Sequence, residues 1–126
     1  MEYGDLLEIQ GNDHICKVPM SRSLDIEKEY LIFRKTFNLE EFKKKLFKDK
    51  TVEWVFYLND FPYNVSKELK HIILWFNESD NSLEQNLKNA EKIIKNYFDD
   101  NVIWFTNVPE YSSIKQLFHV HIFIKN

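Results

Sequence analysis

Residues 117–126 read LFHVHIFIKN, and this stretch decides the fold. Apolar side chains alternate with a second set that contains His119 and His121. Because successive side chains of a strand point to opposite faces, the alternation predicts a strand over residues 118–124. The face expected to lie against the core is made of Phe118, Val120, Ile122 and Ile124. The two histidines share the other face with Phe123.

Three segments upstream have the composition of strands. TVEWVFYL, HIILWF and NVIWF are rich in β-branched and aromatic residues, and polar turn residues separate them. They predict strands at residues 51–58, 71–76 and 101–106. Together with residues 118–124 they would form an antiparallel sheet of about four strands.

Helical patterns fill most of the remaining chain. Ser23, Asn38 and Ser82 stand where a helix would begin, and each can accept a hydrogen bond from a free N–H of the first turn. After the third cap, apolar residues at 4-3-4 spacing predict a buried stripe made of Leu83, Leu87, Ala90 and Ile94. Helices cluster early and strands late. The sequence therefore predicts a single α+β domain over residues 1–126, with helices packed mainly on one face of the sheet.

The composition limits the classes of partner. The net charge is −3, so no bulk binding to nucleic acid or to an anionic membrane is expected. The longest apolar runs are too short to span a bilayer, and the acidic N-terminus lacks the apolar core of a signal peptide. A single cysteine, Cys16, excludes an internal disulfide. We expect an intracellular, cytoplasmic protein.

The two alternating histidines mark a candidate site. Their Cα atoms should lie about 6.5 to 7 Å apart at a rise of about 3.3 Å per residue. His71 opens the second predicted strand, and Asp60 lies in the NDFPYN turn before it. If strands 71–76 and 118–124 are neighbours, Asp60 and the three histidines meet at one edge of the sheet. We therefore regard Asp60, His71, His119 and His121 as the candidate catalytic residues.

Three interpretations of the histidines remain open. Imidazoles at this spacing can converge on a divalent metal such as zinc, with His119, His121 and His71 as ligands. They can equally line a pocket without metal and serve as hydrogen-bonding or acid–base groups. They can also be plain structural residues of a strand. The tryptophans offer a separate alternative, because a pair of them could stack on a flat base while the histidines lie elsewhere.

Two blocks of the chain carry a resemblance. The first is LNDFPYNVSKELKHIILWF, and the second is VIWFTNVPEYSSIKQLFHVHIFIK. They resemble an uncharacterised, mainly fungal domain family, some of whose members are named N-acetylglucosamine-induced protein. The N-terminal stretch VPMSRSLDIEKEYLIF is similar to the family's opening helix. This chain departs from the family in placing Val108 between Asn107 and the following proline.

The resemblance implies a residue list and no reaction, because the family name records induction by an amino sugar. The motif positions that match, beyond Asp60 and the histidines, include the implied ligand-binding residues Asn59, Tyr63, Trp75, Trp104 and Asn107. The leading hypothesis is a pocket that binds a small polar ligand, such as a sugar, a sugar phosphate or a nucleotide. The alternatives are a non-catalytic module for a nucleotide or an mRNA-cap-like base, and a protein–protein interaction module.

Overall fold

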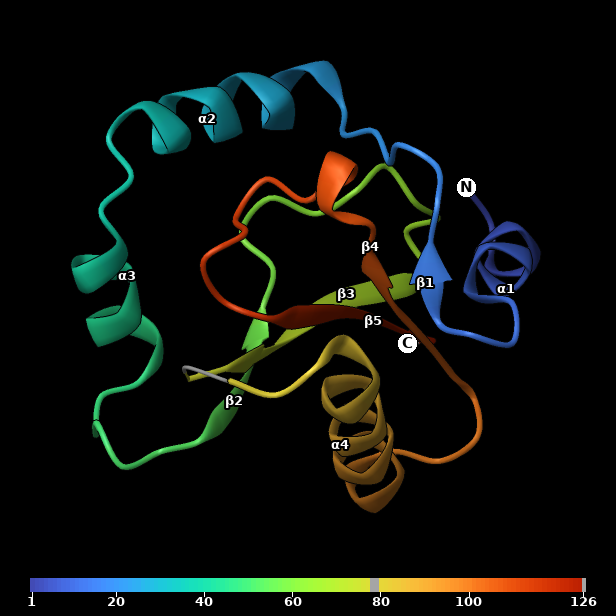
Figure 1. Ribbon diagram of the computed structural model, residues 1–126. Helices are drawn as coiled ribbons and strands as arrows, with labels where there is room; N and C mark the ends of the chain where they lie inside the picture. Colours follow the sequence, from blue (N-terminus) through green and yellow to red (C-terminus); the bar gives the residue numbers. More distant parts are fainter. Residues whose placement is uncertain (78–79, 126) are drawn as a thin grey trace.

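The fold is α+β, as the sequence predicts. The computed structural model describes residues 1–77 and 80–125, and within them it contains four α-helices and a sheet of five strands (Figure 1). In chain order the elements are α1 (Tyr3–Gln10), β1 (Ile15–Cys16), α2 (Leu24–Lys35), α3 (Leu39–Leu46), β2 (Trp54–Leu58), β3 (Leu69–Phe76), α4 (Leu83–Tyr97), β4 (Val102–Asn107), the short 3-10 helix η1 (Pro109–Tyr111) and β5 (His119–Lys125). None of the helices in this part of the chain is long and apolar enough to cross a membrane.

The strand order is β1-β4-β5-β3-β2. The four predicted strands are present and antiparallel, and β3 and β5 are neighbours as the site hypothesis requires. The prediction of an antiparallel sheet of about four strands differs from the structure in one respect. Residues 15–16 add a fifth strand, which pairs parallel with β4. Two residues are too few to show a strand periodicity, so only the tertiary pairing identifies this strand.

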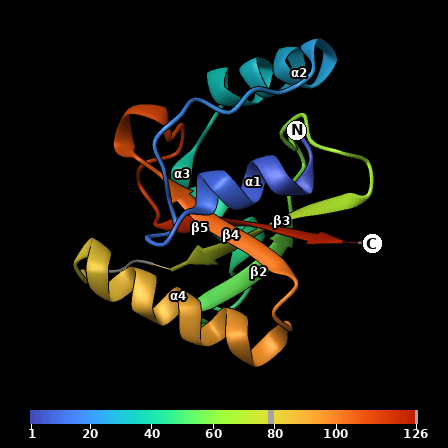
Figure 2. The same cartoon turned by 90° about the vertical axis from the view of Figure 1, so that its right-hand side faces the viewer.

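Helices cover both faces of the sheet. Three of them, α1, α2 and α3, lie on the side to which His119 and His121 point, and α4 lies alone on the other side (Figures 1 and 2). The side chains of the longest helix pack on Leu74, Val120 and Ile122. As a result, β5 is a central strand that is buried on both faces.

The double burial of β5 corrects one expectation. The sequence suggested that only the face of Val120 and Ile122 is a core face. In the structure His119, His121 and Phe123 are buried as well. A central strand with helices above and below has no solvent face, and polar residues on it must find partners inside the protein.

The helix starts are confirmed. The side-chain oxygens of Ser23, Asn38 and Ser82 each accept a hydrogen bond from a backbone N–H three residues further on, at 3.4, 3.1 and 3.2 Å. In α4, Ala90 and Ile94 are buried as predicted, but Leu83 is 48% exposed. This first residue of the helix does not contribute to the buried stripe.

Candidate functional site

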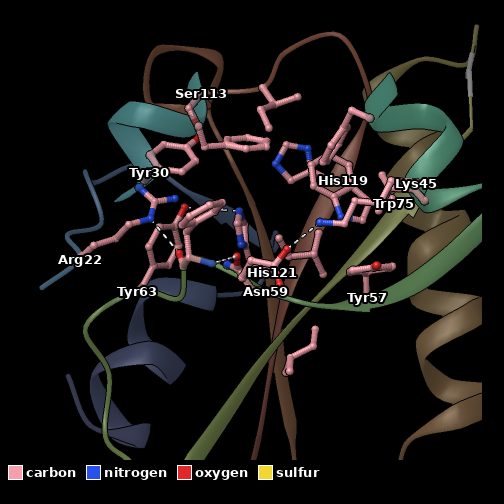
Figure 3. A pocket seen from close by; sticks show the side chains of 18 of the residues that line it. Arg22, Tyr30, Lys45, Tyr57, Asn59, Tyr63, Trp75, Ser113, His119 and His121 are labelled. Carbon is pink, nitrogen blue, oxygen red and sulfur yellow. Dashed lines mark hydrogen bonds and ion pairs between the residues drawn. The ribbon is translucent and has the colours of Figure 1, made fainter. Parts of the chain in front are cut away.

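A pocket lies between the histidine side of the sheet and the helices α2 and α3 (Figure 3). Its walls come from α2, α3, β2, β3, β5, the end of β4, the turn over residues 59–63 and the segment over residues 113–114. The cavity volume is about 60 Å³, so the interior is narrow. Arg22, Tyr30 and Tyr63 stand on one side of it, and Trp75 and Lys45 on the other.

His71 and His121 form a direct pair. The register of β3 and β5 sets Ile73 opposite His121, which puts His71 diagonally across from His121 on the same face. The Nε2 atom of His71 lies 2.8 Å from Nδ1 of His121, a normal hydrogen-bond length. The two imidazoles therefore act as one hydrogen-bonded unit.

The backbone decides where the protons of this pair sit. The N–H of Tyr63 lies 3.2 Å from Nδ1 of His71, and a backbone N–H can only donate. Nδ1 of His71 is therefore the acceptor, and the proton of the neutral ring is on Nε2. That proton is donated to Nδ1 of His121, so the proton of His121 is on its own Nε2. Nε2 of His121 points toward the hydroxyl of Tyr63, at 3.4 Å.

His119 has the opposite tautomer. Its Nδ1 lies 3.0 Å from the carbonyl oxygen of Leu117, so Nδ1 carries the proton and donates it. Its Nε2 is then unprotonated and has no hydrogen-bond partner in the described part of the chain. The ring stacks on Trp75 with 4.3 Å between the centroids, which fixes its orientation. His119 thus offers the pocket a hydrogen-bond acceptor.

All three histidines are neutral at physiological pH. Burial lowers the pKa of His71 to about 3, with a further contribution from the positive charge of Arg22. Burial also lowers the pKa of His119. Burial, with smaller effects from His71, His119 and Arg22, holds the pKa of His121 well below its usual value. Neutral imidazoles have one donor and one acceptor each, which supports the tautomers given above.

The turn over residues 59–63 is fixed to this histidine pair. The side-chain oxygen of Asn59 accepts a hydrogen bond from the N–H of Phe61 at 2.9 Å, and its backbone N–H donates to the carbonyl of His71 at 3.1 Å. The Asn59 amide nitrogen lies 3.3 Å from both ring nitrogens of His71. The turn therefore positions the Tyr63 N–H that sets the tautomers.

Tyr63 and Asn107 complete the polar end of the pocket. The amide nitrogen of Asn107 donates to the Tyr63 hydroxyl at 2.8 Å and lies 3.5 Å from Nε2 of His121. Burial raises the pKa of Tyr63, so its hydroxyl keeps the proton. The side-chain oxygen of Asn107 is buried and has no hydrogen-bond partner in the described part of the chain. We call Arg22, Tyr63, Asn107 and His121 the polar end.

Asp60 reaches the pocket but does not meet the histidines. It lies among the lining residues, where its carboxylate pairs with Lys45 at 2.9 Å. The hydrogen bond that Lys45 donates to the Asp60 carboxylate raises the pKa of Lys45. Both side chains are about half exposed, which places the pair at the mouth. The sequence predicted that Asp60 and three histidines lie together. Among the described residues only the three histidines do so, and Asp60 lies near the entrance of the pocket.

The tryptophans are divided between the two faces of the sheet. Trp75 lines the pocket. Trp104 belongs to the core under α4 and stacks on His14 with 3.8 Å between the centroids. Trp54 packs edge-on against Phe56 on that same side. No two tryptophans face each other across the pocket, and Trp104 is not one of its lining residues.

The histidine geometry does not favour a metal centre. Within residues 1–77 and 80–125, no group of three or more His, Cys, Asp and Glu side chains is arranged to hold a metal ion. The facing nitrogens of His71 and His121 are hydrogen-bonded to each other and do not direct two lone pairs at a common point.

Sequence reasoning missed several residues of the pocket, among them Arg22, Tyr30 and Ser113. The guanidinium of Arg22 lies over the Tyr30 ring, 3.9 Å from its centroid, and Nε donates to the carbonyl of Phe61 at 2.8 Å. The Tyr30 hydroxyl is hydrogen-bonded to that of Ser113, which joins α2 to the segment before β5. One signal for Arg22 was available, because the chain has only two arginines among 17 basic residues. Arginine is the cation best suited to a buried position.

Comparisons with known proteins place the chain among uncharacterised relatives. The family model described as "Protein of unknown function (DUF3605)" matches residues 12–125. "Uncharacterized protein YPL067C" of Saccharomyces cerevisiae is 28% identical over 100 residues, which cover 68% of this chain and 50% of that protein. The chain thus spans about half the length of this curated relative. A solved structure described as "Crystal Structure of HTC1" matches with a TM-score of 0.58 and 18% identity, covering 98% of this chain and 79% of that one. This likeness concerns the fold alone.

Proposed function

The chain belongs to the DUF3605 family of proteins of unknown function, and from that premise we propose that it is a binding domain for a small polar ligand. The ligand would enter the pocket between α2–α3 and the histidine side of the sheet. One observation carries the proposal. Two hydrogen-bonding atoms of the pocket residues, Oδ1 of Asn107 and Nε2 of His119, have no partner in the described part of the chain. The Asn107 oxygen is buried, and a buried atom of this kind is costly to leave without a partner.

The walls support an organic ligand. Trp75, Phe42 and Tyr57 supply apolar and aromatic surface, while the polar end supplies hydrogen bonds. Pockets of this mixed kind are typical of small-molecule sites. A sugar, a sugar phosphate or a nucleotide has a ring that can pack on the walls and polar groups that can hydrogen-bond at the polar end.

The chemistry of the histidines favours binding over catalysis. A general base works best when its pKa is near the ambient pH, and burial lowers the pKa of His71 to about 3. Asp60 is engaged by Lys45 at the mouth. If a reaction occurs, His119 is the group to take a proton from a ligand hydroxyl, because its Nε2 is unprotonated. The tryptophan-stacking alternative has weaker support, because only Trp75 lines the pocket.

The narrower kinship with proteins named N-acetylglucosamine-induced protein is also a proposal. It rests on the two blocks around NDFPY and HVH, and it makes amino sugars and their phosphates the first ligands to test. We further propose a cytoplasmic location, since the lone Cys16 is a buried free thiol. Fractionation of cells that express the tagged protein tests the location.

The test of the function is a titration of the purified protein with N-acetylglucosamine, glucosamine 6-phosphate and uridine monophosphate, followed by calorimetry. We expect saturable one-site binding of at least one of them, and loss of at least tenfold in affinity in His119→Phe. That change keeps a ring to stack on Trp75 and removes Nε2. His14→Phe is the matched control, because His14 does not line the pocket and stacks on Trp104 instead. Equal affinity in the wild type and in His119→Phe would refute the assignment of this pocket.

A further inference from the structure

We propose that the polar end of the pocket binds an anionic oxygen group, a carboxylate or a phosphate, through Arg22 and through hydrogen-bond donors whose direction is set by the backbone N–H of Tyr63. The inference rests on the proposed function and names the chemical class of the ligand. It concerns which atoms a ligand must present, whereas the proposed function concerns whether the pocket is occupied at all.

The hydrogen bonds around the histidine pair have a fixed direction. A side-chain hydroxyl or amide can rotate to exchange donor and acceptor, but the backbone N–H of Tyr63 cannot. It makes Nδ1 of His71 an acceptor, and the bond of 2.8 Å between the two imidazoles passes this direction on to His121. Nε2 of His121 must therefore carry a proton toward the polar end.

The polar end has an excess of donors. The N–H of His121, the amide hydrogens of Asn107 and the hydroxyl hydrogen of Tyr63 converge there. The acceptors among these groups are only the Tyr63 and Asn107 oxygens. Nε2 of His121 lies 3.4 Å from the Tyr63 hydroxyl and 3.5 Å from the Asn107 amide nitrogen. Both distances are longer than those of a strong hydrogen bond. The unpartnered Oδ1 of Asn107 is itself an acceptor and does not favour an anion, so Asn107 must bind it through its N–H₂ end. Turning the amide over would put that N–H₂ end in the unpartnered position, with Oδ1 then accepting from the Tyr63 hydroxyl. A ligand group with acceptors and no donors fits the N–H of His121 and the N–H₂ group of Asn107.

Arg22 brings a positive charge to the polar end. The Arg22 side chain is only 12% exposed, and its Nε–H is fixed by the Phe61 carbonyl. Its ion pair with Glu27, at 3.7 Å, is longer than a hydrogen bond, so terminal N–H groups remain able to bind an anion. The guanidinium also lies 5.0 Å from the centre of the Tyr63 ring, which places it beside the donors (Figure 3). Lys45 is already balanced by Asp60. Glu27 offsets the charge of Arg22 only across a longer contact to a more exposed carboxylate, so the Arg22 guanidinium is the cation that a ligand anion can reach.

His119 takes no part in this arrangement. Its unprotonated Nε2 is an acceptor and would receive a hydrogen bond from a hydroxyl or amide elsewhere on the ligand. This separation allows the inference and the proposed function to fail independently. Loss of the His119 acceptor should weaken a complete ligand and leave the binding of a bare anion within about twofold of wild type.

The direction of the hydrogen bonds can be measured without any ligand. Long-range ¹H–¹⁵N spectra of the wild-type protein at pH 7 report which nitrogen of each imidazole carries the proton. We expect protons on Nε2 of His71 and His121, and on Nδ1 of His119. A proton on Nδ1 of His121 would put an acceptor at the polar end and overturn the inference.

The anion itself is tested with inorganic phosphate, with acetate, and with acetamide as the neutral counterpart of acetate. Titrations are followed by the side-chain amide signal of Asn107 and by calorimetry. We expect saturable binding of phosphate, acetate or both, with acetamide at least tenfold weaker than acetate if the site takes carboxylates. Phosphate alone assigns a phosphate-bearing ligand, and acetate alone a carboxylate. Failure of both anions, or equal binding of acetate and acetamide with no response to phosphate, overturns the inference.

Variants at the two arginines complete the test. Arg22→Met keeps the length of the side chain and removes the charge, and it should weaken the bound anion at least tenfold. Arg22→Lys should restore part of the affinity. Arg34→Met, at the exposed arginine of α2, is the matched control and should bind as the wild type does. If Arg22→Met binds the anion as well as the control, the assignment is wrong. If organic ligands bind in the earlier titration while both anions fail here, the function stands and this inference alone falls.

Discussion

His71, His119 and His121 are buried and neutral, and this has a measurable consequence for stability. At neutral pH each ring donates and accepts one hydrogen bond or is free to do so, and a second proton would put a charge in a buried site. The unfolded chain pays no such cost and takes up these protons at its ordinary pKa. The difference links folding to pH.

Acidification should therefore destabilise the protein. The folded pKa of His71, about 3, lies below the unfolded value of 6.5, so the folded state binds fewer protons in the interval between them. The free energy of unfolding should have its full value above pH 6.5. As the pH is lowered below 6.5, it should decrease by up to about 1.4 kcal/mol per pH unit for each such histidine. Urea unfolding at pH 7.5, 6.0 and 5.0 measures it. His71→Gln should show a shallower dependence, and a flat profile in the wild type would contradict the prediction.

The Tyr63 hydroxyl gives a second prediction at this scale. Tyr63→Phe removes the acceptor of the Asn107 hydrogen bond and leaves a partly buried amide group without that partner. The loss should cost about 1 to 3 kcal/mol of unfolding free energy. Tyr111→Phe, at an exposed tyrosine of η1, is the control and should change the stability by less than about 0.5 kcal/mol. Equal effects of the two changes in urea unfolding would show that the bond contributes nothing.

At the scale of elements, α4 shows how far a periodic pattern can be followed. Its stripe at 4-3-4 spacing correctly identified Ala90 and Ile94 as buried, but it also included Leu83, which is half exposed. The period predicts the side of a helix that faces the core. It does not say where along the helix the sheet ends.

A pair of alanine variants on α4 tests this directly. Ile94 is 2% exposed, and Ile94→Ala should cost about 2 to 5 kcal/mol because it leaves a cavity in a packed core. Leu83→Ala should cost less than about 1 kcal/mol, since the side chain is half in water already. Urea unfolding gives both values. A cost for Leu83→Ala as large as that for Ile94→Ala would mean that the stripe is buried along its whole length.

At the scale of the whole molecule, α1 belongs to the domain although the family match begins after it. The match covers residues 12–125, whereas α1 is Tyr3–Gln10. Leu6 is 0% exposed and packs in one cluster with Phe105 and Phe123 of the two central strands. The last residue of the helix is also bonded to β4. The carboxamide oxygen of Gln10 accepts a hydrogen bond from the N–H of Trp104 at 2.9 Å.

We therefore expect Leu6→Ala to destabilise the whole domain by about 2 to 5 kcal/mol, in a single cooperative transition. Leu7→Ala is the adjacent control on the same helix and should change the stability by less than about 1 kcal/mol, since Leu7 lies on the exposed side. Urea unfolding followed by both tryptophan fluorescence and circular dichroism measures the two. A negligible effect of Leu6→Ala would show α1 to be an independent appendage.

The sequence by itself determined α2, α3 and α4, four of the five described strands and the α+β class, because capping residues and hydrophobic periods are local signals. It also predicted, partly through the family resemblance, most of the residues that gather at the candidate site. His71, His119, His121, Asn59, Tyr63, Trp75 and Asn107 come together in the structure at the positions that the two motif blocks mark. These residues lie on a strand pair and its adjoining turn, or on the strand beside it, and alternation assigns the strand residues to faces.

Only the tertiary structure decided the rest, since it depends on contacts between segments that are far apart in the chain. The parallel strand β1 exists because β4 lies next to it, and its two residues carry no period. Arg22 reaches Phe61 across 39 positions, and the direction of its side chain follows from the path of α2 over the pocket. Trp104 was assigned to the site by its motif, but its strand position turns it toward α4. The alternation along a strand assigns its side chains to two faces. Only the packing of helices on the sheet decides whether each face forms core or lines a pocket.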